Sequence, residues 1–384
     1  MEAYVFAKTG RIELRELPAP VLSSASEEDR RAAVLRPRYL SPCASDVHTV
    51  FAGPGPRREG LVLGHEGLAE VVSVGDGVKA FHPGELVAVS AVMPEVPDGT
   101  GHENSPFSGG KLGRNLNGMW SELFYVPEAD ENLAHIPEGI TKEQALMCVD
   151  MAATGFTAAE EAGIEPGQTV VVLGLGAVGL MAVSAARYFG AGKILAVGSE
   201  GRSECTALAA DYGADLVLSR TTGKELYVRE RASAGAHTEA VSRHPLANST
   251  KSPAVDRILD LTEGQGADRV LVCGGDGAVL AQACDIVRYG TGVVSNVSYF
   301  EGSGMIGLPI FSLGRGMAGK TFRFSYCRGG RRRLELLMRL VGEGRLGDPG
   351  RLVTHRLSGF HKIPEALSLM RDKPEGLIKL MIEL

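Results

Sequence analysis

The chain has 384 residues, more than one hydrophobic core usually serves, so we expect two domains. Its composition, 44% hydrophobic and 22% charged, is that of an ordinary globular protein. The net charge of −6 argues against nucleic acid or an anionic membrane as the main partner, and no apolar stretch is long enough to span a bilayer. The six cysteines form no C-x-x-C pair, which argues against a disulfide framework. We therefore expect a cytoplasmic protein.

The first 150 residues contain short alternating or apolar runs that are separated by Gly and Pro, such as "AEVVSVG" and "ELVAVSAV". This pattern predicts a mostly β domain. Residues 92–118 are rich in Gly, Pro and Asn, so we expect a long loop there, and long loops within compact domains are usually functional or mobile.

From about residue 154 the pattern changes to apolar strands alternating with helices: "GQTVVVLG", "AVGLMAVSAARYFG", "KILAVG" and their successors. Such alternation predicts a parallel sheet with helices on both faces. The polar stretch 221–253 interrupts it and reads as a surface insertion, partly helical at best. After residue 298 the alternation of strands and helices ends. We therefore predict one domain from residues 1–153 and 298–384 and a second from residues 154–297.

The sequence "VVVLGLGAVGL" places Gly174, Gly176 and Gly179 in G-x-G-x-x-G spacing between a strand and a helix. The first glycine permits the tight turn, the second lets the backbone approach a pyrophosphate, and the third lets the helix pack closely on the strand. Because both flanking elements are present, we predict a dinucleotide site here, with Ala177 and Val178 at the start of the helix included.

The residues at the end of the next predicted strand, "KILAVG", bear on whether the cofactor is NAD or NADP. Gly198 occupies the position expected for a ribose-binding acid and Ser199 follows it, which leaves room for a 2′-phosphate, with Arg202 or Arg220 as a charge partner. Glu200 argues the other way, since it could accept the 2′-hydroxyl or repel a phosphate. Glu200 and Arg202 could also be simple exposed turn residues. NADP is favoured, and NAD stays open.

Residues able to bind a metal are spread over the first domain: Cys43 in "SPCASDVH", His65 and Glu66 in "LGHEG", and Asp150 in "LMCVDMAATGF". A catalytic zinc takes three ligands from Cys, His and carboxylates and keeps a further position open. Each residue alone has an ordinary explanation, because a lone cysteine usually packs in a core and a lone histidine is usually a satisfied polar residue. Together they suggest a metal held beside the nicotinamide.

These motifs, in order, give the chain its resemblance to a known family. "LSPCASDVHTVF", "LGHEGLAEVVSVG", "GLGAVGLMAV" and "LVTHRLSGF" resemble a zinc-dependent medium-chain dehydrogenase/reductase, closest to the bacterial NADP-dependent secondary-alcohol dehydrogenases. The likeness covers nearly the whole chain except 221–253 and a shortened loop at 100–118. It implies an α/β protein, with a GroES-like, mostly β catalytic domain and a doubly wound Rossmann domain.

The resemblance implies roles for the candidate residues. Zinc is bound by Cys43, His65 and Asp150, with Glu66 as an exchangeable fourth ligand, and acts as a Lewis acid on an alcohol or carbonyl oxygen.

The resemblance also assigns residues around the reacting groups. Ser45 contacts the substrate oxygen, His48 relays its proton, and Thr154 approaches the nicotinamide. Trp120, the only tryptophan, aligns near an aromatic residue that lines the pocket, although core packing explains it equally well.

The implied reaction is hydride transfer between a nicotinamide cofactor, with NADP favoured, and a small secondary alcohol, ketone or aldehyde, in a homotetramer or homodimer. Two departures from the family pattern matter: Glu200 stands where the NADP branch usually has arginine, and the 100–118 loop is short. They support an alternative, an NAD-dependent polyol, diol or amino-sugar dehydrogenase. A remote alternative is a non-catalytic binding protein of the same fold.

Overall fold

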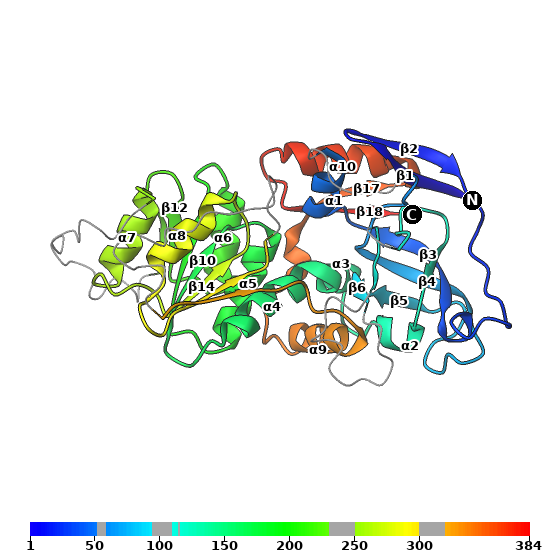
Figure 1. Cartoon of the computed structure of the whole chain (residues 1–384), viewed down its shortest axis with the longest axis horizontal. Helices are drawn as coiled ribbons and strands as arrows, with labels where there is room; N and C mark the ends of the chain where they lie inside the picture. The colour runs from blue at the N-terminus through cyan, green and yellow to red at the C-terminus, as the bar shows by residue number, and fades with distance from the viewer. Residues whose placement is uncertain (52–58, 94–109, 114–115, 230–249, 299–318) are drawn as a thin grey trace. The chain divides into compact units, whose positions relative to one another are not determined.

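The computed structural model describes residues 1–51, 59–93, 110–113, 116–229, 250–298 and 319–384. The chain packs as two compact units (Figure 1). The first comprises residues 1–153 and 327–384, and the second comprises residues 154–326.

The first unit is built mainly from antiparallel strands. Its largest sheet has the order β17-β18-β3-β4-β5-β9, with β8 paired to β3. Two further pairs, β1 with β2 and β6 with β7, lie outside it. The strands are β1 (Glu2–Lys8), β2 (Arg11–Glu16), β3 (Ala33–Leu40), β4 (Gly67–Val74), β5 (Leu86–Val89), β6 (Val92–Met93), β7 (Gly110–Lys111), β8 (Phe124–Val126), β9 (Leu133–His135), β17 (Val353–Ser358) and β18 (Lys379–Glu383).

Short helices connect these strands. They are α1 (Ala44–Phe51), α2 (Ala129–Asn132), α3 (Lys142–Met147), α9 (Arg331–Gly342) and α10 (Ile363–Asp372). The core combines apolar side chains of β1, β3 and β4, including Val5, Leu35 and Val71, with Ile363 and Leu367 of α10. Burying this apolar surface is the main driving force for folding the unit.

The register of β3 with its two neighbours determines which residues meet at its end. Leu40 pairs with Gly67 of β4 and with Ile382 of β18, both in antiparallel pairs. Because paired residue numbers in antiparallel strands have a constant sum, the segment after Leu40 runs beside the segment before Gly67 and beside Lys379. Residues from three distant parts of the sequence therefore share one end of the sheet.

The second unit contains a seven-stranded sheet in the order β13-β12-β11-β10-β14-β15-β16. All neighbours pair in parallel except β13, which is antiparallel to β12. Counted from β10, the six parallel strands have the order 3-2-1-4-5-6, which is that of a doubly wound Rossmann sheet. The strands are β10 (Thr169–Leu173), β11 (Lys193–Gly198), β12 (Leu216–Ser219), β13 (Glu225–Val228), β14 (Arg269–Val272), β15 (Val293–Asn296) and β16 (Thr321–Phe324).

Helices cover both faces of this sheet. They are α4 (Ala153–Ala162), α5 (Ala177–Tyr188), α6 (Ser203–Asp211), α7 (Pro253–Leu261) and α8 (Ala278–Ile286). Apolar residues of α7 and α8 pack with alternate residues of the strands, such as Val171 and Leu173 of β10. Helices α5 and α6 contact β10, β11 and β12 and each other. The predicted fold class is thus confirmed.

Three segments differ from their expected structure. Within the predicted insertion 221–253, residues 225–228 form the edge strand β13 rather than a helix, and residues 230–249 lie outside the described part. Strand β16 pairs with β15, so the sheet continues past the predicted junction at residue 298. In the predicted loop 92–118, β6 and β7 pair with each other, while 94–109 lie outside the described part. Edge strands carry polar side chains, which weakens their sequence signal.

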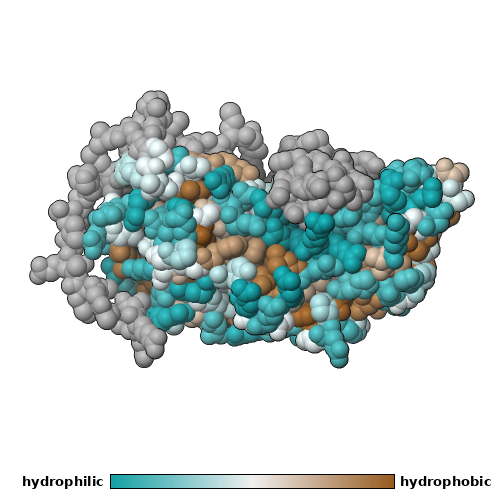
Figure 2. All heavy atoms as spheres, turned by 90° about the horizontal axis from the view of Figure 1, so that it is seen from below, coloured by the Kyte–Doolittle hydropathy of each residue, from teal (hydrophilic) through white to brown (hydrophobic). Residues whose placement is uncertain are grey.

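Hydrophilic and apolar residues are interspersed on the described surface, as Figure 2 shows for one face. Large exposed hydrophobic residues occur singly in the sequence, for example Val21 and Phe324. Among the described residues, no helix is both long and apolar enough to cross a membrane.

Candidate metal centre and nucleotide site

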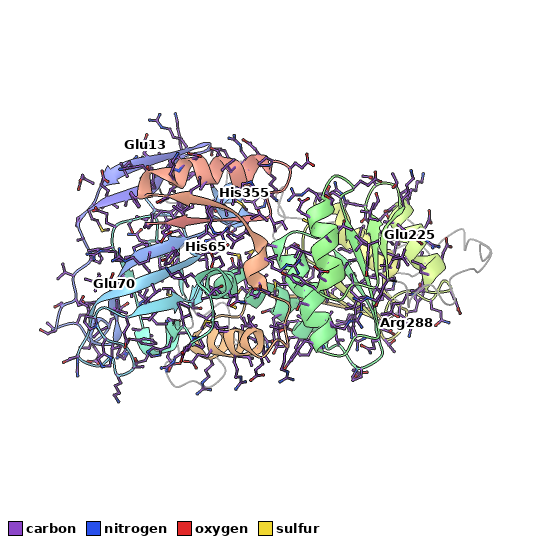
Figure 3. The ribbon with its side chains drawn as sticks, turned by 180° about the vertical axis from the view of Figure 1, so that it is seen from behind. Glu13, His65, Glu70, Glu225, Arg288 and His355 are labelled. Carbon is purple, nitrogen blue, oxygen red and sulfur yellow. The ribbon has the colours of Figure 1, made fainter. Side chains whose placement is uncertain are left out.

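Four side chains that can bind metal converge in the first unit. They are the predicted ligands Cys43, His65, Glu66 and Asp150, all buried, with one ligand atom of each within 4.8 Å of the others. Figure 3 shows His65 inside this unit, among its strands. Cys43 and Asp150 are 107 positions apart in the sequence, so only the fold unites them.

The strand register explains how the cluster forms. Cys43 follows β3 and His65 precedes β4, and Ser41 donates a backbone hydrogen bond to Glu66 across this end of the sheet at 3.1 Å. Asp150 lies in a single π-helical turn, Cys148–Ala152, directly after α3. Such turns are frequent at functional sites because the extra residue re-aims a side chain.

Two distances between ligand atoms of the cluster are close to those around a tetrahedral zinc ion. Cys43 Sγ lies 3.6 Å from Asp150 Oδ2, and His65 Nε2 lies 3.3 Å from the same oxygen. Ligand bonds of about 2.3 Å to sulfur and about 2.0–2.1 Å to nitrogen or oxygen give tetrahedral edges of about 3.5 Å and about 3.4 Å. The Oε2 atom of Glu66 is buried without a hydrogen bond among the described residues. Its lone pairs are thus available for the fourth position.

Asp46, which sequence reasoning did not single out, orients two of these ligands. One of its carboxylate oxygens lies 3.2 Å from His65 Nδ1, and the other accepts the backbone N–H of Cys43 at 2.9 Å. A carboxylate on Nδ1 fixes the ring so that Nε2 faces the metal position. The sequence feature that could have indicated this role is the acid in the first turn of α1. In a capping box, such a side chain accepts the backbone N–H of the residue three positions earlier.

Lys379 is a second residue that the sequence analysis missed. Its ammonium is buried, donates to Pro42 O and to Glu66 Oε1 at 2.8 Å each, and lies 2.8 Å from Glu66 Oε2. Only the first of the two contacts with Glu66 has hydrogen-bond geometry, so Oε2 is attracted by charge alone. The signal was a lone lysine in the apolar run "LIKLMIEL".

Burial and crowded acids shape the ionisation of the cluster. Burial raises the pKa of the Cys43 thiol, and the carboxylates of Glu66 and Asp150 raise it further. Burial also raises the pKa of Glu66, although Lys379 opposes this shift. Burial lowers the pKa of His65, but Asp46 and Asp150 more than compensate, so that it lies well above its usual value. The site concentrates negative charge that a divalent cation balances.

Ser45 and His48 both lie on α1. The Oγ atom of Ser45 is 3.3 Å from His65 Nε2, so the structure brings Ser45 to the cluster. His48 is half-buried and lies three positions further along, on the same helical face as Ser45.

Trp120 packs in the core instead of lining a pocket. Its side chain is fully buried and belongs to the central apolar cluster of the first unit. It lies against Gly64, where an added Cβ would come within 2.1 Å of the indole ring and where φ is +87°. A glycine is therefore required directly before His65, and of the two explanations for Trp120, core packing is the one observed.

The glycine turn in the second unit has the geometry that its spacing predicts. Gly174 has φ +95°, in the left-handed region that glycine tolerates best. Gly176 is the N-cap of α5, and an added Cβ there would meet nothing within 4 Å. At Gly179 an added Cβ would lie 1.8 Å from Gly174 O. Ala177 and Val178 form the first turn of α5, so their backbone N–H groups lie at its N-terminus.

The residues predicted to select the cofactor follow β11. Gly198 packs against Leu175, which an added Cβ would approach to 2.9 Å. Ser199 and Glu200 are exposed. Arg202 pairs with Glu204 at 2.5 Å.

Thr154, predicted to approach the nicotinamide, is buried in the first turn of α4.

Comparison with known proteins identifies the family. Residues 29–138 match the model of the alcohol dehydrogenase GroES-like domain, and residues 177–343 match that of zinc-binding dehydrogenases. The chain is 41% identical to the NADP-dependent isopropanol dehydrogenase of Thermoanaerobacter brockii, over 97% of this chain and 96% of that protein. The chain belongs to the zinc-binding alcohol dehydrogenases. The resemblance seen in its motifs is thereby confirmed.

Two further comparisons agree with this assignment to the dehydrogenases. The NADP-dependent isopropanol dehydrogenase of Clostridium beijerinckii is 40% identical over 91% of this chain and 92% of that protein. Among solved structures, the alcohol dehydrogenase TADH from Thermus sp. ATN1 has a TM-score of 0.78 and 27% identity, with both chains covered completely.

The roles of the glycines can be separated by substitution. We expect Gly179→Ala to lower the free energy of unfolding of this dehydrogenase by about 1–3 kcal/mol, because the new Cβ meets the Gly174 carbonyl. Gly176→Ala should change it by less than about 0.5 kcal/mol, yet weaken dinucleotide binding, because the methyl group occupies the pyrophosphate's approach. Urea unfolding and cofactor titration check both. Equal stability loss in the two variants would contradict this assignment.

The role of Asp46 predicts a metal-binding defect. Asp46→Asn should weaken zinc affinity by about 10–100-fold, because the His65 ring loses its anchoring carboxylate. Competition with a zinc chelator measures the change. The matched control is Asp76→Asn, which removes an exposed acid paired with Arg30 at 2.8 Å. The same affinity in both variants would show that Asp46 has no part in holding the metal.

The Lys379–Glu66 pair predicts a stability effect in the metal-free protein. Lys379→Met should lower the free energy of unfolding by about 3–5 kcal/mol, because it leaves a buried carboxylate without its partner. Adding Glu66→Gln should restore part of the loss. Urea unfolding after chelation tests both variants, and additive losses would argue against coupling of the two charges.

Proposed function

We propose that the protein is a zinc- and NADP-dependent dehydrogenase that interconverts small secondary alcohols with their ketones, or aldehydes with alcohols. The convergence of a thiol, an imidazole and two carboxylates on one buried point is the observation that carries this proposal. The names of the relatives that are about 40% identical, NADP-dependent isopropanol dehydrogenases, support the substrate class and the cofactor.

In this proposal Cys43, His65 and Asp150 hold the metal, and Glu66 takes the exchangeable fourth position. Their donor set suits zinc, and when bound zinc supplies Lewis-acid chemistry on an alcohol or carbonyl oxygen. Asp46 keeps the His65 ring oriented. Lys379 holds the Glu66 carboxylate near the cluster without using both of its oxygens for hydrogen bonds.

Ser45 and His48 move the proton. During alcohol oxidation the hydroxyl proton would pass to Ser45 Oγ as the Ser45 proton moves on to His48. A bound nicotinamide would supply the acceptor for the hydride from the carbon that carries the hydroxyl. During reduction both transfers run in reverse. An imidazole can both accept and donate a proton, which suits His48 for this role. The position of Ser45 Oγ beside the cluster supports the relay.

The nucleotide is held by the second unit. Gly174, Gly176 and Gly179, with the backbone of Ala177 and Val178, accommodate the pyrophosphate at the N-terminus of α5. Gly198 and Ser199, at the carboxyl end of β11, would lie beside the adenosine ribose, and Thr154 would lie beside the nicotinamide.

We propose residues 1–153 and 327–384 as the catalytic domain, with residues 154–326 as the nucleotide-binding domain. We further propose a cytoplasmic homodimer or homotetramer. Strand β16 forms one edge of the second sheet, and Phe324 on it is 57% exposed, which supports contact between copies.

A second candidate is an NAD-dependent polyol, diol or amino-sugar dehydrogenase. Glu200 favours it, because a carboxylate near the end of the second strand can accept the 2′-hydroxyl of NAD. Comparing NADPH with NADH oxidation over ketones, hydroxyketones and cyclic ketones separates the candidates. Faster NADH oxidation with hydroxylated substrates would favour the second.

Metal removal tests the proposed chemistry. Cys43→Ser and His65→Ala should lose zinc and reduce turnover of propan-2-ol to background, while the circular dichroism spectrum is unchanged, because neither residue belongs to the apolar core cluster that drives folding of the first unit. Metal analysis and NADP reduction are measured on the same samples. Cys327→Ser, which changes a buried cysteine outside the cluster, serves as the matched control.

Two results would contradict the proposal. A metal-free variant with wild-type turnover would remove zinc from the mechanism. Negligible zinc in carefully purified wild-type protein would instead favour a non-catalytic protein of the same fold.

A further inference from the structure

Strands β11 and β12 end side by side, and charged residues follow both strands. Gly198, the last residue of β11, pairs with Ser219, the last residue of β12. In doubly wound sheets the adenosine ribose lies at the carboxyl end of the second strand. The loops after these two strands carry three cationic side chains, those of Arg202, Arg220 and Lys224.

The carboxylate of Glu200 already accepts hydrogen bonds from residues at this edge. Its Oε1 atom accepts the hydroxyl of Ser219 at 2.5 Å and also the hydroxyl of Thr222. These two hydrogen bonds, aided by the charge of Lys224, lower the pKa of Glu200. The carboxylate is therefore drawn toward the loop after β12, with Lys224 offsetting part of its charge.

Arg202, one of the two arginines that the sequence offers as a charge partner for a 2′-phosphate, already forms an ion pair. Its Nε atom lies 2.5 Å from Glu204 Oε1, and only about a quarter of each side chain is exposed. To bind a phosphate, Arg202 would have to give up its ion pair with Glu204, which lies two positions later in the first turn of α6.

Arg220 differs from both. Its backbone N–H donates to Gly198 O at 2.7 Å, which fixes its Cα beside the last residue of β11. The residue is exposed, and within the described part of the chain its guanidinium forms no hydrogen bond or ion pair. Of the three cations at this edge, only Arg220 is attached by its backbone to Gly198.

We propose that Arg220 binds the 2′-phosphate of NADP and so determines the cofactor preference of this dehydrogenase. The inference rests on the proposed NADP dependence and adds the residue that creates it. A guanidinium presents a planar fork that can bind a phosphate through two parallel hydrogen bonds. Gly198, where an added Cβ would approach Leu175 to 2.9 Å, places no acid at the last position of β11 itself, and the exposed Ser199 adds a hydroxyl.

The binding of two nucleotide fragments tests this proposal without catalysis. Adenosine 2′,5′-bisphosphate carries the 2′-phosphate and 5′-AMP lacks it, and isothermal titration of the zinc-loaded enzyme measures both. Arg220→Gln should weaken binding of the bisphosphate by about 10–100-fold, the loss expected for a charge-assisted contact, and change 5′-AMP binding by less than about twofold. Arg220→Lys should restore part of the loss, because it keeps the charge without the fork.

Matched variants at the same edge make the test specific. Arg202→Gln and Lys224→Gln each remove one cation and should weaken bisphosphate binding by less than about threefold, the effect of a charge screened by solvent. Glu200→Gln keeps an acceptor for Ser219 and Thr222, and should leave 5′-AMP binding within about twofold.

The outcomes distinguish the role of Arg220 from the NADP dependence on which it rests. In one outcome the wild-type enzyme prefers the bisphosphate while Arg220→Gln binds it as tightly as wild type does, and in another Arg202→Gln is the variant that binds it more weakly. Either result would overturn the role of Arg220 and leave NADP dependence intact. A wild-type enzyme that does not prefer the bisphosphate would overturn both. A tenfold loss of 5′-AMP binding in Glu200→Gln would show that Glu200 binds the ribose hydroxyl, as an NAD enzyme requires.

Discussion

The register of β3 with β4 and β18 is the constraint on which the metal centre depends. Leu40 pairs with Gly67 on one side and with Ile382 on the other, so the residues just beyond these pairs meet at one end of the sheet. They include Cys43 and His65. A slip of one residue in either pair would turn every side chain of that strand to the opposite face, which would separate the ligands. The last strand of the chain is therefore part of the site as well as of the core.

Charge balance at this end of the sheet sets a second condition. Carboxylates and a thiol are buried together, and taking such groups out of water is costly unless an opposite charge accompanies them. Lys379 offsets one negative charge through Glu66. A divalent cation supplies the remainder, so we interpret metal binding and the stability of this end of the sheet as linked.

Much of this was accessible from the sequence, and the rest was hidden for physical reasons. The alternation of apolar strands and helices reveals a parallel sheet because those strands are buried on both faces. Edge strands β13 and β16 lack that signal, since their residues are exposed or only half-buried. Cys43, His65 and Asp150 are uncommon residue types at informative places, whereas Asp46 and Lys379 look like ordinary charged residues until the fold buries them. Arg202 forms an ion pair with Glu204. Whether an arginine has such a partner depends on side-chain geometry, which the spacing of residues in the sequence does not reveal.

The measurement that tests the central claim most directly is the zinc K-edge X-ray absorption spectrum of the purified enzyme. Three or four protein ligands with a single thiolate predict one sulfur at about 2.3 Å and nitrogen or oxygen neighbours at about 2.0–2.2 Å. The fine structure also counts the sulfurs, so it separates this site from a four-cysteine structural zinc. One sulfur per zinc is the result we expect. A shell with no sulfur, or one with two or more, would contradict the centre built on Cys43, His65 and Asp150.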